Sequence, residues 1–300
     1  MRWNVLNIST EQTLLPQKIS FKLNGGYGGE YPIDLRTTAT FLIHFQQLID
    51  KTYCVISNAE RITKDDRKNY QLLVKDLKVG SLESDLLLTI AGGLLALPYP
   101  GFCTPQTLWD FTVMAYELAT RFFTDTSAGK NPQITNNGDN NRNIIYMVQG
   151  DLITYPADAF NIANNSLPLY KSMGKALNEG NFTSFTATNQ ASTCAPLVMS
   201  KNTEALFKGT TKVESTLYTL SGNIISFNKE TRSGKIRIPK DNQQTVVHDY
   251  PFTIIGDQDC DLYIQAMKSN SVSIKALKEI SYTSLEPQIK RLQIIHISSD

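Results

Sequence analysis

The sequence contains few cysteines and histidines, and their spacing does not fit metal or redox chemistry. The four cysteines are Cys54, Cys103, Cys194 and Cys260. They lie far apart without a C-x-x-C pair, which argues against a zinc ribbon or a redox motif and is typical of reduced thiols in a cytosolic protein. The three histidines, His44, His248 and His296, are too scattered to suggest a metal site. We therefore expect no cofactor and no metal ion.

The sequence also lacks a hydrophobic run long enough to cross a bilayer. The longest apolar stretch, residues 86–102, is interrupted by Gly92, Gly93, Pro98 and Pro100. It is shorter than the roughly 18 to 20 uninterrupted residues that a spanning helix needs. The beginning of the chain, MRWNVLNISTEQ, has no apolar core of signal-peptide length. We expect a cytoplasmic protein that does not contact a membrane.

A strong net charge is absent as well. The chain has 29 Lys and Arg against 28 Asp and Glu, a formal net charge of +1, and charged residues make up 19% of it. A protein that neutralises many phosphates usually carries a basic surplus, and this chain has none overall. The 41% of hydrophobic residues is ample for packed cores, and 300 residues usually form two domains.

Motifs of the common enzyme classes do not occur. The sequence has no G-x-S-x-G nucleophile motif, no H-E-x-x-H pair and no kinase signature. We predict no catalytic residues. Because Asp and Glu are plentiful, a hydrolase whose carboxylate site is assembled from distant positions stays an alternative.

One glycine-rich stretch, NGGYGGEYPIDL at residues 24–35, is the nearest match to a ligand motif. A Walker loop needs a Lys-Ser/Thr pair at the helix start, and a dinucleotide loop needs G-x-G-x-x-G running directly into the helix. Here Glu30 would repel a phosphate, and Pro32 lacks an N–H donor. We interpret the stretch as a turn, in which glycine supplies a positive φ.

A second stretch, GDQDCDL, places Asp257, Asp259 and Asp261 at alternate positions, like the start of a calcium loop. That loop needs Gly at its sixth and Glu at its twelfth position, where this sequence has Leu262 and Lys268. Acidic residues at a helix start also suit the helix dipole without any metal, which is the interpretation that we prefer.

Hydrophobic patterning predicts an α+β fold with an N-terminal mixed sheet and two long helices. Residues 17–23 alternate as a strand, and residues 69–90 resemble two strands that break near Gly80. The first long helix begins near Arg36 with Asp34 as its cap, and the second spans 104–123 with Thr104 as its cap. A hairpin turning at 149–151 and a short helix from Ser166 to Gly180 follow, after an exposed loop at 127–143.

The pattern changes after this region. Residues 181–213 are rich in Thr, Asn and Ser with little periodicity, so we place a linker there, between an α+β domain at 1–180 and a second domain at 214–300. In the second domain, three predicted strands, a short helix and two strands follow one another. This is the order of an OB-fold, a small five-stranded barrel, although another small barrel or a sandwich stays an alternative.

An OB-like barrel raises the possibility of single-stranded nucleic-acid binding. The candidate contacts are Phe227, Lys229, Arg232, Lys235 and Arg237. Such surfaces stack bases on several aromatic rings above a basic groove, whereas here only Phe227 stands at a plausible stacking position. Residues 214–300 carry ten basic and ten acidic side chains, so the domain is neutral. Nucleic-acid binding is therefore an alternative that we do not favour.

The helix predicted at 104–123 is apolar on nearly every side. Its candidate interface residues are Phe111, Met114, Tyr116, Leu118, Phe122 and Phe123. Such a helix is buried within its own domain or against a partner, and a single sheet covers only one face. We expect self-association or a stable complex with a protein partner.

Residues 17–180 resemble an uncharacterised group of bacterial proteins found near mobile elements and phage-defence genes. The matching stretches are ISFKLNGGYGGEYPIDL, VGSLESDLLL, WDFTVMAYELATRFF, NNGDNNRNIIYMV and LPLYKSMGKAL. The resemblance implies a bacterial or phage cytosolic setting and a role in conflict between phage and host, without implying an activity. Together these features predict a non-enzymatic protein-interaction or sensing subunit, an accessory component of a phage-defence system.

Overall fold

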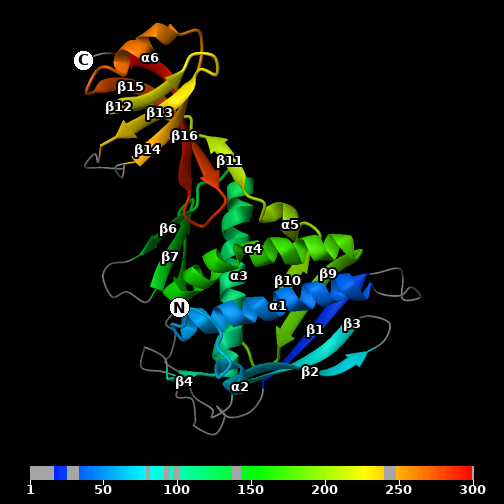
Figure 1. Ribbon diagram of the computed structural model, residues 1–300. Helices are drawn as coiled ribbons and strands as arrows, with labels where there is room; N and C mark the ends of the chain where they lie inside the picture. Colours follow the sequence, from blue (N-terminus) through cyan, green and yellow to red (C-terminus); the bar gives the residue numbers. More distant parts are fainter. Residues whose placement is uncertain are drawn as a thin grey trace. The chain divides into compact units, whose positions relative to one another are not determined.

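The computed structural model describes residues 17–25, 34–78, 82–90, 95–96, 102–136, 143–239 and 248–298 (Figure 1). The chain forms two compact units, Met1–Lys208 and Gly209–Asp300. This confirms the α+β class, with helices on a sheet in the first unit and a barrel in the second. Among the described residues, no helix has both the length and the apolar character that crossing a membrane requires.

The first unit is built on a five-stranded sheet with the order β10-β9-β1-β3-β2. Its strands are β1 (Gln17–Gly25), β2 (Tyr70–Lys78), β3 (Leu82–Ile90), β9 (Phe182–Asn189) and β10 (Leu197–Ser200). All pairings are antiparallel, so the expectation of a mixed sheet was wrong. On β1 the apolar Ile19, Phe21 and Leu23 are buried, whereas Lys18 and Lys22 are exposed. One face of the sheet is therefore packed and the other is solvated, as antiparallel sheets allow.

Three long helices pack in this unit, α1 (Leu35–Ile56), α3 (Pro105–Ser127) and α4 (Ala157–Glu179), together with the short α2 (Asp66–Asn69) and α5 (Thr203–Leu206). The predicted caps are confirmed: Asp34 accepts from the backbone of Arg36 and Thr37, and Thr104 accepts from Thr107 N. Figure 1 shows α1 and α4 running side by side across the sheet.

The third long helix corrects the prediction of only two, because α4 begins at Ala157 and Ser166 lies buried within it instead of capping it. Residues 157–165 contain Asp and several Asn, which are poor helix formers. Their apolar positions Ile162 and Ala163 are nevertheless fully buried. The burial of these apolar side chains therefore outweighs the low helix propensity of the polar residues around them.

Residues 181–213 are not a linker. They form β9 and β10 of the sheet, then α5, and β11 (Thr210–Val213) of the second unit. In β9 the side chains of Phe185 and Ala187 are buried in the core. Ser184, Thr186 and Thr188 alternate with them and are only partly buried. This alternation is hidden in the sequence because Thr is both polar and a good strand former. The two units divide at 208/209, within the interval 181–213 in which the sequence placed the boundary.

A three-stranded antiparallel sheet, β6 (Gln133–Asn136), β7 (Asn143–Val148) and β8 (Asp151–Pro156), completes most of the unit, with a two-stranded pair β4 (Leu95–Ala96) and β5 (Phe102–Cys103). The predicted hairpin is confirmed. Its two turn residues, Gln149 and Gly150, have φ of 50° and 94°, and positive φ at both positions is typical of a type I′ turn. The turn near Gly80 and the Asn137-Gly138 step lie outside the described residues.

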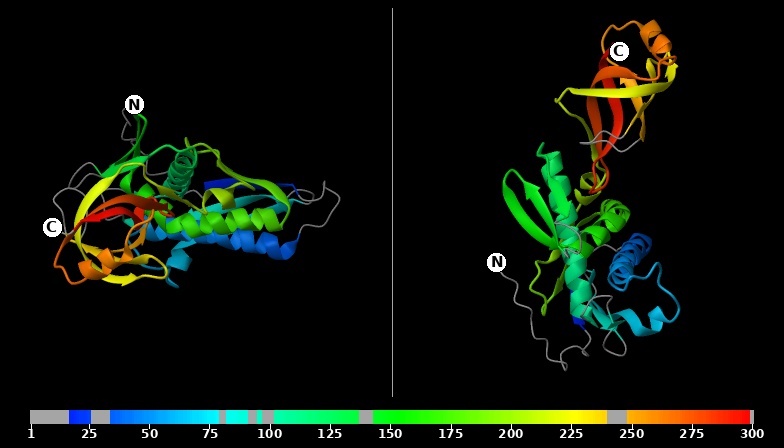
Figure 2. Two further views of the ribbon diagram at one scale, coloured as in Figure 1. Left: turned by 90° about the horizontal axis from the view of Figure 1, so that it is seen from above. Right: turned by 90° about the vertical axis from the view of Figure 1, so that its left-hand side faces the viewer.

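The second unit is a closed five-stranded barrel (Figure 2), as the sequence predicted. Its elements are β12 (Tyr218–Asn228), β13 (Ser233–Ile238), β14 (His248–Ile254), α6 (Cys260–Ala266), β15 (Val272–Tyr282) and β16 (Gln288–Ser298). The barrel order is β12-β13-β14-β16-β15 and returns to β12, with β14 and β16 parallel. This is OB-like topology. Ile236, Phe252, Tyr263 and Ile274 are central to its core.

Only one glycine of the 24–35 stretch is described in full. Gly25 has φ +99°, and a Cβ there would lie 2.6 Å from the backbone N of Thr183. This glycine is thus required by the backbone at the end of β1, in keeping with the interpretation as a turn. Residues 26–33, which include Gly28, Gly29, Glu30 and Pro32, lie outside the described residues.

Candidate functional site

The structure buries most of the predicted interface on α3 within the first unit. Leu118 and Phe122 are 0% exposed and Phe123 is 2% exposed. The rings of Tyr116 and Phe123 contact Phe207, with centroids 6.1 and 5.4 Å apart. The premise of a free apolar face was therefore wrong for these residues, because α1, α4 and α5 cover the helix in addition to the sheet.

The remaining two candidates on α3, Phe111 and Met114, are half-buried.

The outer edge of β10, the edge strand next to α3, is hydrogen-bonded to neighbouring side chains. Tyr116 Oη donates to the carbonyl of Val198 at 2.8 Å, and Ser200 N donates to Thr203 Oγ1 at 3.0 Å. Edge strands are protected from pairing when their backbone groups are satisfied in this way, so β10 offers no template for an added strand.

Among the barrel residues proposed to contact nucleic acid, two are engaged within the barrel itself. Phe227 packs against the core, with its ring 5.2 Å from that of Tyr263. Arg232 donates to the carbonyls of Gly256 and Gln258. Lys235 is exposed.

The other two basic candidates are engaged by carboxylates. Lys229 pairs with Asp261 at 2.9 Å, and Arg237 makes two hydrogen bonds to Asp249, at 2.7 and 3.0 Å. Asp259 caps α6 by accepting from Asp261 N, so these aspartates have the structural role that we preferred to a calcium loop. In β12, β13 and β14, the rings of Phe227, Tyr250 and Phe252 belong to the barrel core or pack against it. Tyr218 is half-buried, and the Lys278 ammonium lies 3.6 Å from its ring centroid. These strands therefore present few free rings on which the bases of single-stranded nucleic acid could stack.

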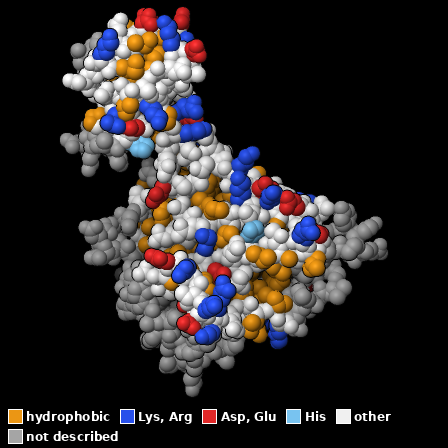
Figure 3. Space-filling view, viewed as in Figure 1, with side chains coloured by type: hydrophobic (Ala, Val, Ile, Leu, Met, Phe, Trp, Pro, Cys, Tyr) orange, Lys and Arg blue, Asp and Glu red, His pale blue; other side chains and the backbone are white. Residues whose placement is uncertain are grey.

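Figure 3 shows basic and acidic side chains interspersed over the visible face of the barrel, without a continuous basic surface. No group of three His, Cys, Asp or Glu side chains in the described part of the chain could hold a metal ion. Two of the thiols are poor nucleophiles: burial and the nearby Asp110 raise the pKa of Cys194 to about 11, and burial and Asp50 raise the pKa of Cys54. A low pKa is what activates a catalytic cysteine.

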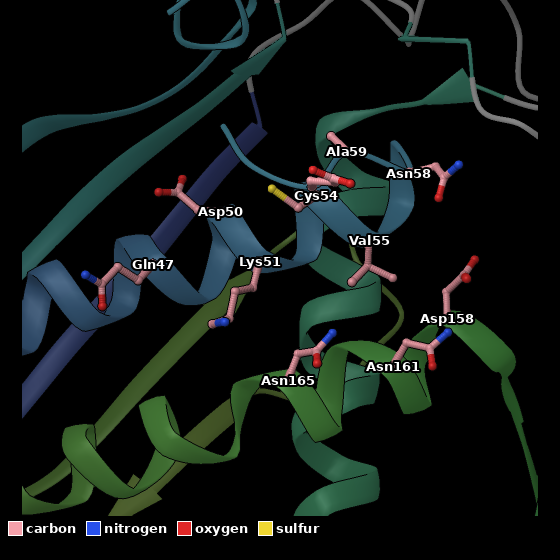
Figure 4. A pocket seen from close by; sticks show the side chains of 11 residues that line it. Gln47, Asp50, Lys51, Cys54, Val55, Asn58, Ala59, Asp158, Asn161 and Asn165 are labelled. Atoms are coloured by element: carbon pink, nitrogen blue, oxygen red, sulfur yellow. The ribbon is translucent and has the colours of Figure 1, made fainter. Parts of the chain in front are cut away.

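A groove of about 770 Å³ lies between α1 and α4 in the first unit (Figure 4). The lining residues are Gln47, Asp50, Lys51, Cys54, Val55, Asn58, Ala59, Glu60, Asp158, Asn161 and Asn165. On α1 they recur at helical spacing from Gln47 to Val55, and Asn58, Ala59 and Glu60 follow the end of this helix. On α4 they stand at i, i+3 and i+7. Residues with these spacings share one face of a helix. Two polar stripes on neighbouring helices therefore face a shared space, which we call the α1–α4 groove.

One wall of the α1–α4 groove is held rigidly. Asp50 Oδ1 accepts from Gln46 Nε2 at 2.7 Å and from Tyr70 Oη at 3.0 Å, and Tyr70 stacks on Tyr53 with centroids 4.9 Å apart. The buried Tyr70 thereby ties α1 to β2. In Figure 4 the Asp50 carboxylate points away from α4, toward this contact. The Asp50 carboxylate thus stabilises the contact between α1 and β2 and is not directed toward a ligand in the groove.

Gln47, at one end of the groove, is hydrogen-bonded to His44, with Gln47 Oε1 3.2 Å from His44 Nδ1, whereas several other polar side chains are unengaged. Asp158, in the first turn of α4, is half-buried, and burial alone raises its pKa. Within the described residues, neither Asp158 nor Lys51 has an ion pair or a hydrogen bond to another side chain. The carboxamides of Asn58, Asn161 and Asn165 likewise have no partner there. Figure 4 shows Asp158 rising from α4 on the side of Asn58, and Lys51 pointing down toward α4. The groove therefore keeps its hydrogen-bonding capacity for a ligand.

Sequence reasoning missed this groove because the first half of α4 was not predicted as a helix. Without that helix, Asp158, Asn161 and Asn165 have no common face. The available signal was their spacing, which places all three on one side of any helix through 157–165. The stripe on α1 was present in the predicted first helix, opposite the apolar stripe that was used to predict it.

Comparison of the chain with protein-family models, with curated proteins and with solved structures gave no match in any of the three. The α1–α4 groove and the chemistry of the side chains that line it are therefore the features from which we infer a function.

Proposed function

We propose that this protein is a non-enzymatic binding subunit that holds an extended polypeptide segment of a partner protein in the α1–α4 groove. The observation that carries the proposal is the set of three unengaged carboxamides, Asn58, Asn161 and Asn165, on the two walls of one groove. A carboxamide both donates through its NH₂ and accepts through its oxygen. It therefore matches a peptide unit, which presents one N–H and one C=O.

The dimensions of the groove support a short segment. Asp158 and Asn165 are about two turns apart on α4, which corresponds to about 10 Å along the helix. An extended chain advances about 3.3 Å per residue, so this wall is matched by about three residues. The wall on α1, from Gln47 to Val55, is about 12 Å long, and Asn58 extends it past the end of the helix. A segment of three to five residues fits the two walls.

The lining chemistry favours a peptide over other ligands. Among the described residues that line the groove, none is aromatic, whereas nucleobases are usually held by stacking on aromatic rings. The same lining offers no activated nucleophile, because the pKa of Cys54 is raised by burial and by Asp50. Asp50 itself accepts two hydrogen bonds from side chains of its own unit. These features support binding without catalysis.

For the biological setting of this binding, the support is the sequence resemblance of residues 17–180 to bacterial proteins encoded near mobile elements and phage-defence genes. We propose that the bound segment belongs to another component of such a system, with this chain as the accessory or sensing subunit. The resemblance is the support for this part of the proposal.

The test is a selection of peptides by the full chain. A phage-displayed library of random 12-residue peptides is panned on the immobilised protein, and enriched peptides are synthesised and titrated. We expect binding that Asn161→Trp and Asn165→Trp each weaken by about 10-fold or more, because an indole at either position fills the groove. The matched control is Lys171→Trp, which places the same ring on the exposed part of α4 outside the groove lining.

Two results would refute the proposal. One is a selection in which no peptide is enriched over several rounds. The other is a set of enriched peptides that bind Asn161→Trp and Asn165→Trp as tightly as the unaltered chain, since these peptides would then occupy another surface. Circular dichroism and a thermal melt of each variant verify that the substitutions leave the fold intact.

A further inference from the structure

We infer that the segment held in the α1–α4 groove carries a lysine or arginine side chain whose charge is paired with Asp158. This inference rests on the proposed function, and it names the chemistry of the segment. Three observations support it: the negative charge of the groove lining, the partial burial of Asp158 without a side-chain partner, and the separate positions of Asp158 and Lys51 along the groove.

The groove lining carries an excess of negative charge. Its acidic side chains are Asp50, Glu60 and Asp158, and its one basic side chain among the described residues is Lys51. Asp50 is held by Gln46 and Tyr70 and points away from α4 (Figure 4). Glu60 is exposed at the end of the α1 wall. Asp158 is therefore the carboxylate on the α4 wall with which a bound segment can pair.

Asp158 is partly buried and has no cationic partner among the described residues. Partial burial raises the pKa of this carboxyl. Its place in the first turn of α4 puts it near the positive end of the helix dipole, but no hydrogen bond or ion pair with another described side chain compensates the loss of solvent. A half-buried carboxylate without a partner is unfavourable, because desolvation disfavours the charged form. A cationic side chain arriving with the ligand would supply that partner. Charge complementarity of this kind mainly gives specificity, which is the property that the test measures.

Lys51 does not take this role. Within the described residues no ion pair joins Lys51 to Asp158, and Figure 4 shows the Lys51 amine over the part of α4 that carries Asn165. The two unpaired charges thus lie at different places along the groove. A segment lying along α4 would place its basic side chain by Asp158 and a backbone carbonyl by Lys51, with Asn161 between them to bond its backbone.

The experiment uses four mixtures of fluorescein-labelled, end-blocked heptapeptides. Each mixture has one fixed central residue, lysine, arginine, norleucine or glutamate, and random uncharged residues elsewhere. Binding to the full chain is measured by fluorescence anisotropy at low and moderate salt. We expect the lysine and arginine mixtures to bind about 5- to 20-fold more tightly than the norleucine mixture, since norleucine keeps the aliphatic stem of lysine without the charge.

Substitutions at Asp158 identify the partner of that charge. Asp158→Asn should abolish the preference for lysine over norleucine, and Asp158→Lys should reverse it in favour of the glutamate mixture. Asp151→Asn is the matched control, because it removes one negative charge from an exposed turn of the same unit outside the groove lining. This variant should keep the preference of the unaltered chain.

The outcomes separate this inference from the proposed function. If all four mixtures bind equally and Asn161→Trp abolishes binding, the groove binds peptides and the basic residue is refuted. The basic residue is also refuted if Asp158→Asn or Asp158→Lys leaves the preference unchanged. If no mixture binds although the library selection yields groove-dependent peptides, only the inference falls. If that selection fails too, the proposed function falls with it.

Discussion

Replacing Phe185 by alanine tests the assignment of residues 181–213 most directly, because this ring lies in the segment that the sequence presents as a linker. Phe185 is 0% exposed. Its ring centroid lies 4.7 Å from that of Phe41, 5.3 Å from that of Phe45 and 6.1 Å from that of Phe21. The side chain therefore joins β9 to α1 and to β1, and its loss leaves a cavity between a helix and the sheet.

The magnitude follows from these contacts. Truncating a fully buried Phe to Ala costs about 3 to 5 kcal/mol of stability, as the sum of lost transfer free energy and the cavity. Because Phe185 makes tilted or edge contacts with three rings, each contributing about 0.5 kcal/mol or more beyond its burial, we expect about 4 kcal/mol. With an m-value of about 2 kcal/mol/M in urea, the midpoint of unfolding falls by about 2 M. In a true linker, the same change would have almost no effect.

Tryptophan fluorescence provides a selective assay. The chain has two tryptophans, Trp3 and Trp109, and residues 209–300, the second unit, contain none. Trp109 is 1% exposed, so its emission reports the unfolding of this core and not that of the barrel. The matched control is Thr186→Ala on the outer face of the same strand, for which we expect less than about 1 kcal/mol. A Phe185→Ala midpoint no lower than that of Thr186→Ala would refute the placement of β9 in the core.

Two further predictions concern a glycine and a thiol. Gly25→Ala should destabilise the first unit by more than Gly129→Ala in a thermal melt: both glycines have positive φ, which costs about 1 kcal/mol for alanine, but only at Gly25 would the new Cβ meet backbone, at Thr183 N. Equal shifts would show that β1 and β9 tolerate a wider spacing there. Cys194 should react with iodoacetamide at about pH 7.5 roughly 100-fold more slowly than an unperturbed thiol, because its pKa is raised from 9.0 to about 11 by burial and Asp110; rapid alkylation seen by peptide mass spectrometry would contradict the inert thiol.

Local features of the fold could be predicted from the sequence because their causes are local. Asp34 and Thr104 cap helices because a short oxygen-bearing side chain at that position reaches the first free N–H groups of the helix. The hairpin at Gln149 and Gly150 follows from a two-residue turn between two β-rich runs. The order of strands and helix in the barrel was likewise readable from alternating patterns, and an OB-like closure is one of few solutions for that order.

The candidate site could be predicted only in part. The polar stripe on α1 is visible in a helix that the sequence predicts, but a groove needs a second wall. That wall is the first half of α4, where Asn161 and Asn165 argue against a helix by their intrinsic propensity. The neighbouring apolar positions are buried against other elements, and this burial stabilises the helix. Asp158 becomes a half-buried, unpaired carboxylate only through the same packing.

The sequence by itself therefore determined where helices begin, where chains turn and which faces are apolar, since these depend on residues within a few positions of one another. Tertiary structure alone decided that the apolar α3 is satisfied by Phe207 and its neighbours within the first unit, and that Phe185 belongs to a core strand. It also decided that polar residues of α1 and α4 share one groove. These outcomes depend on contacts between segments far apart in the chain, whose free energy of burial exceeds local preference and is not encoded in any short window of sequence.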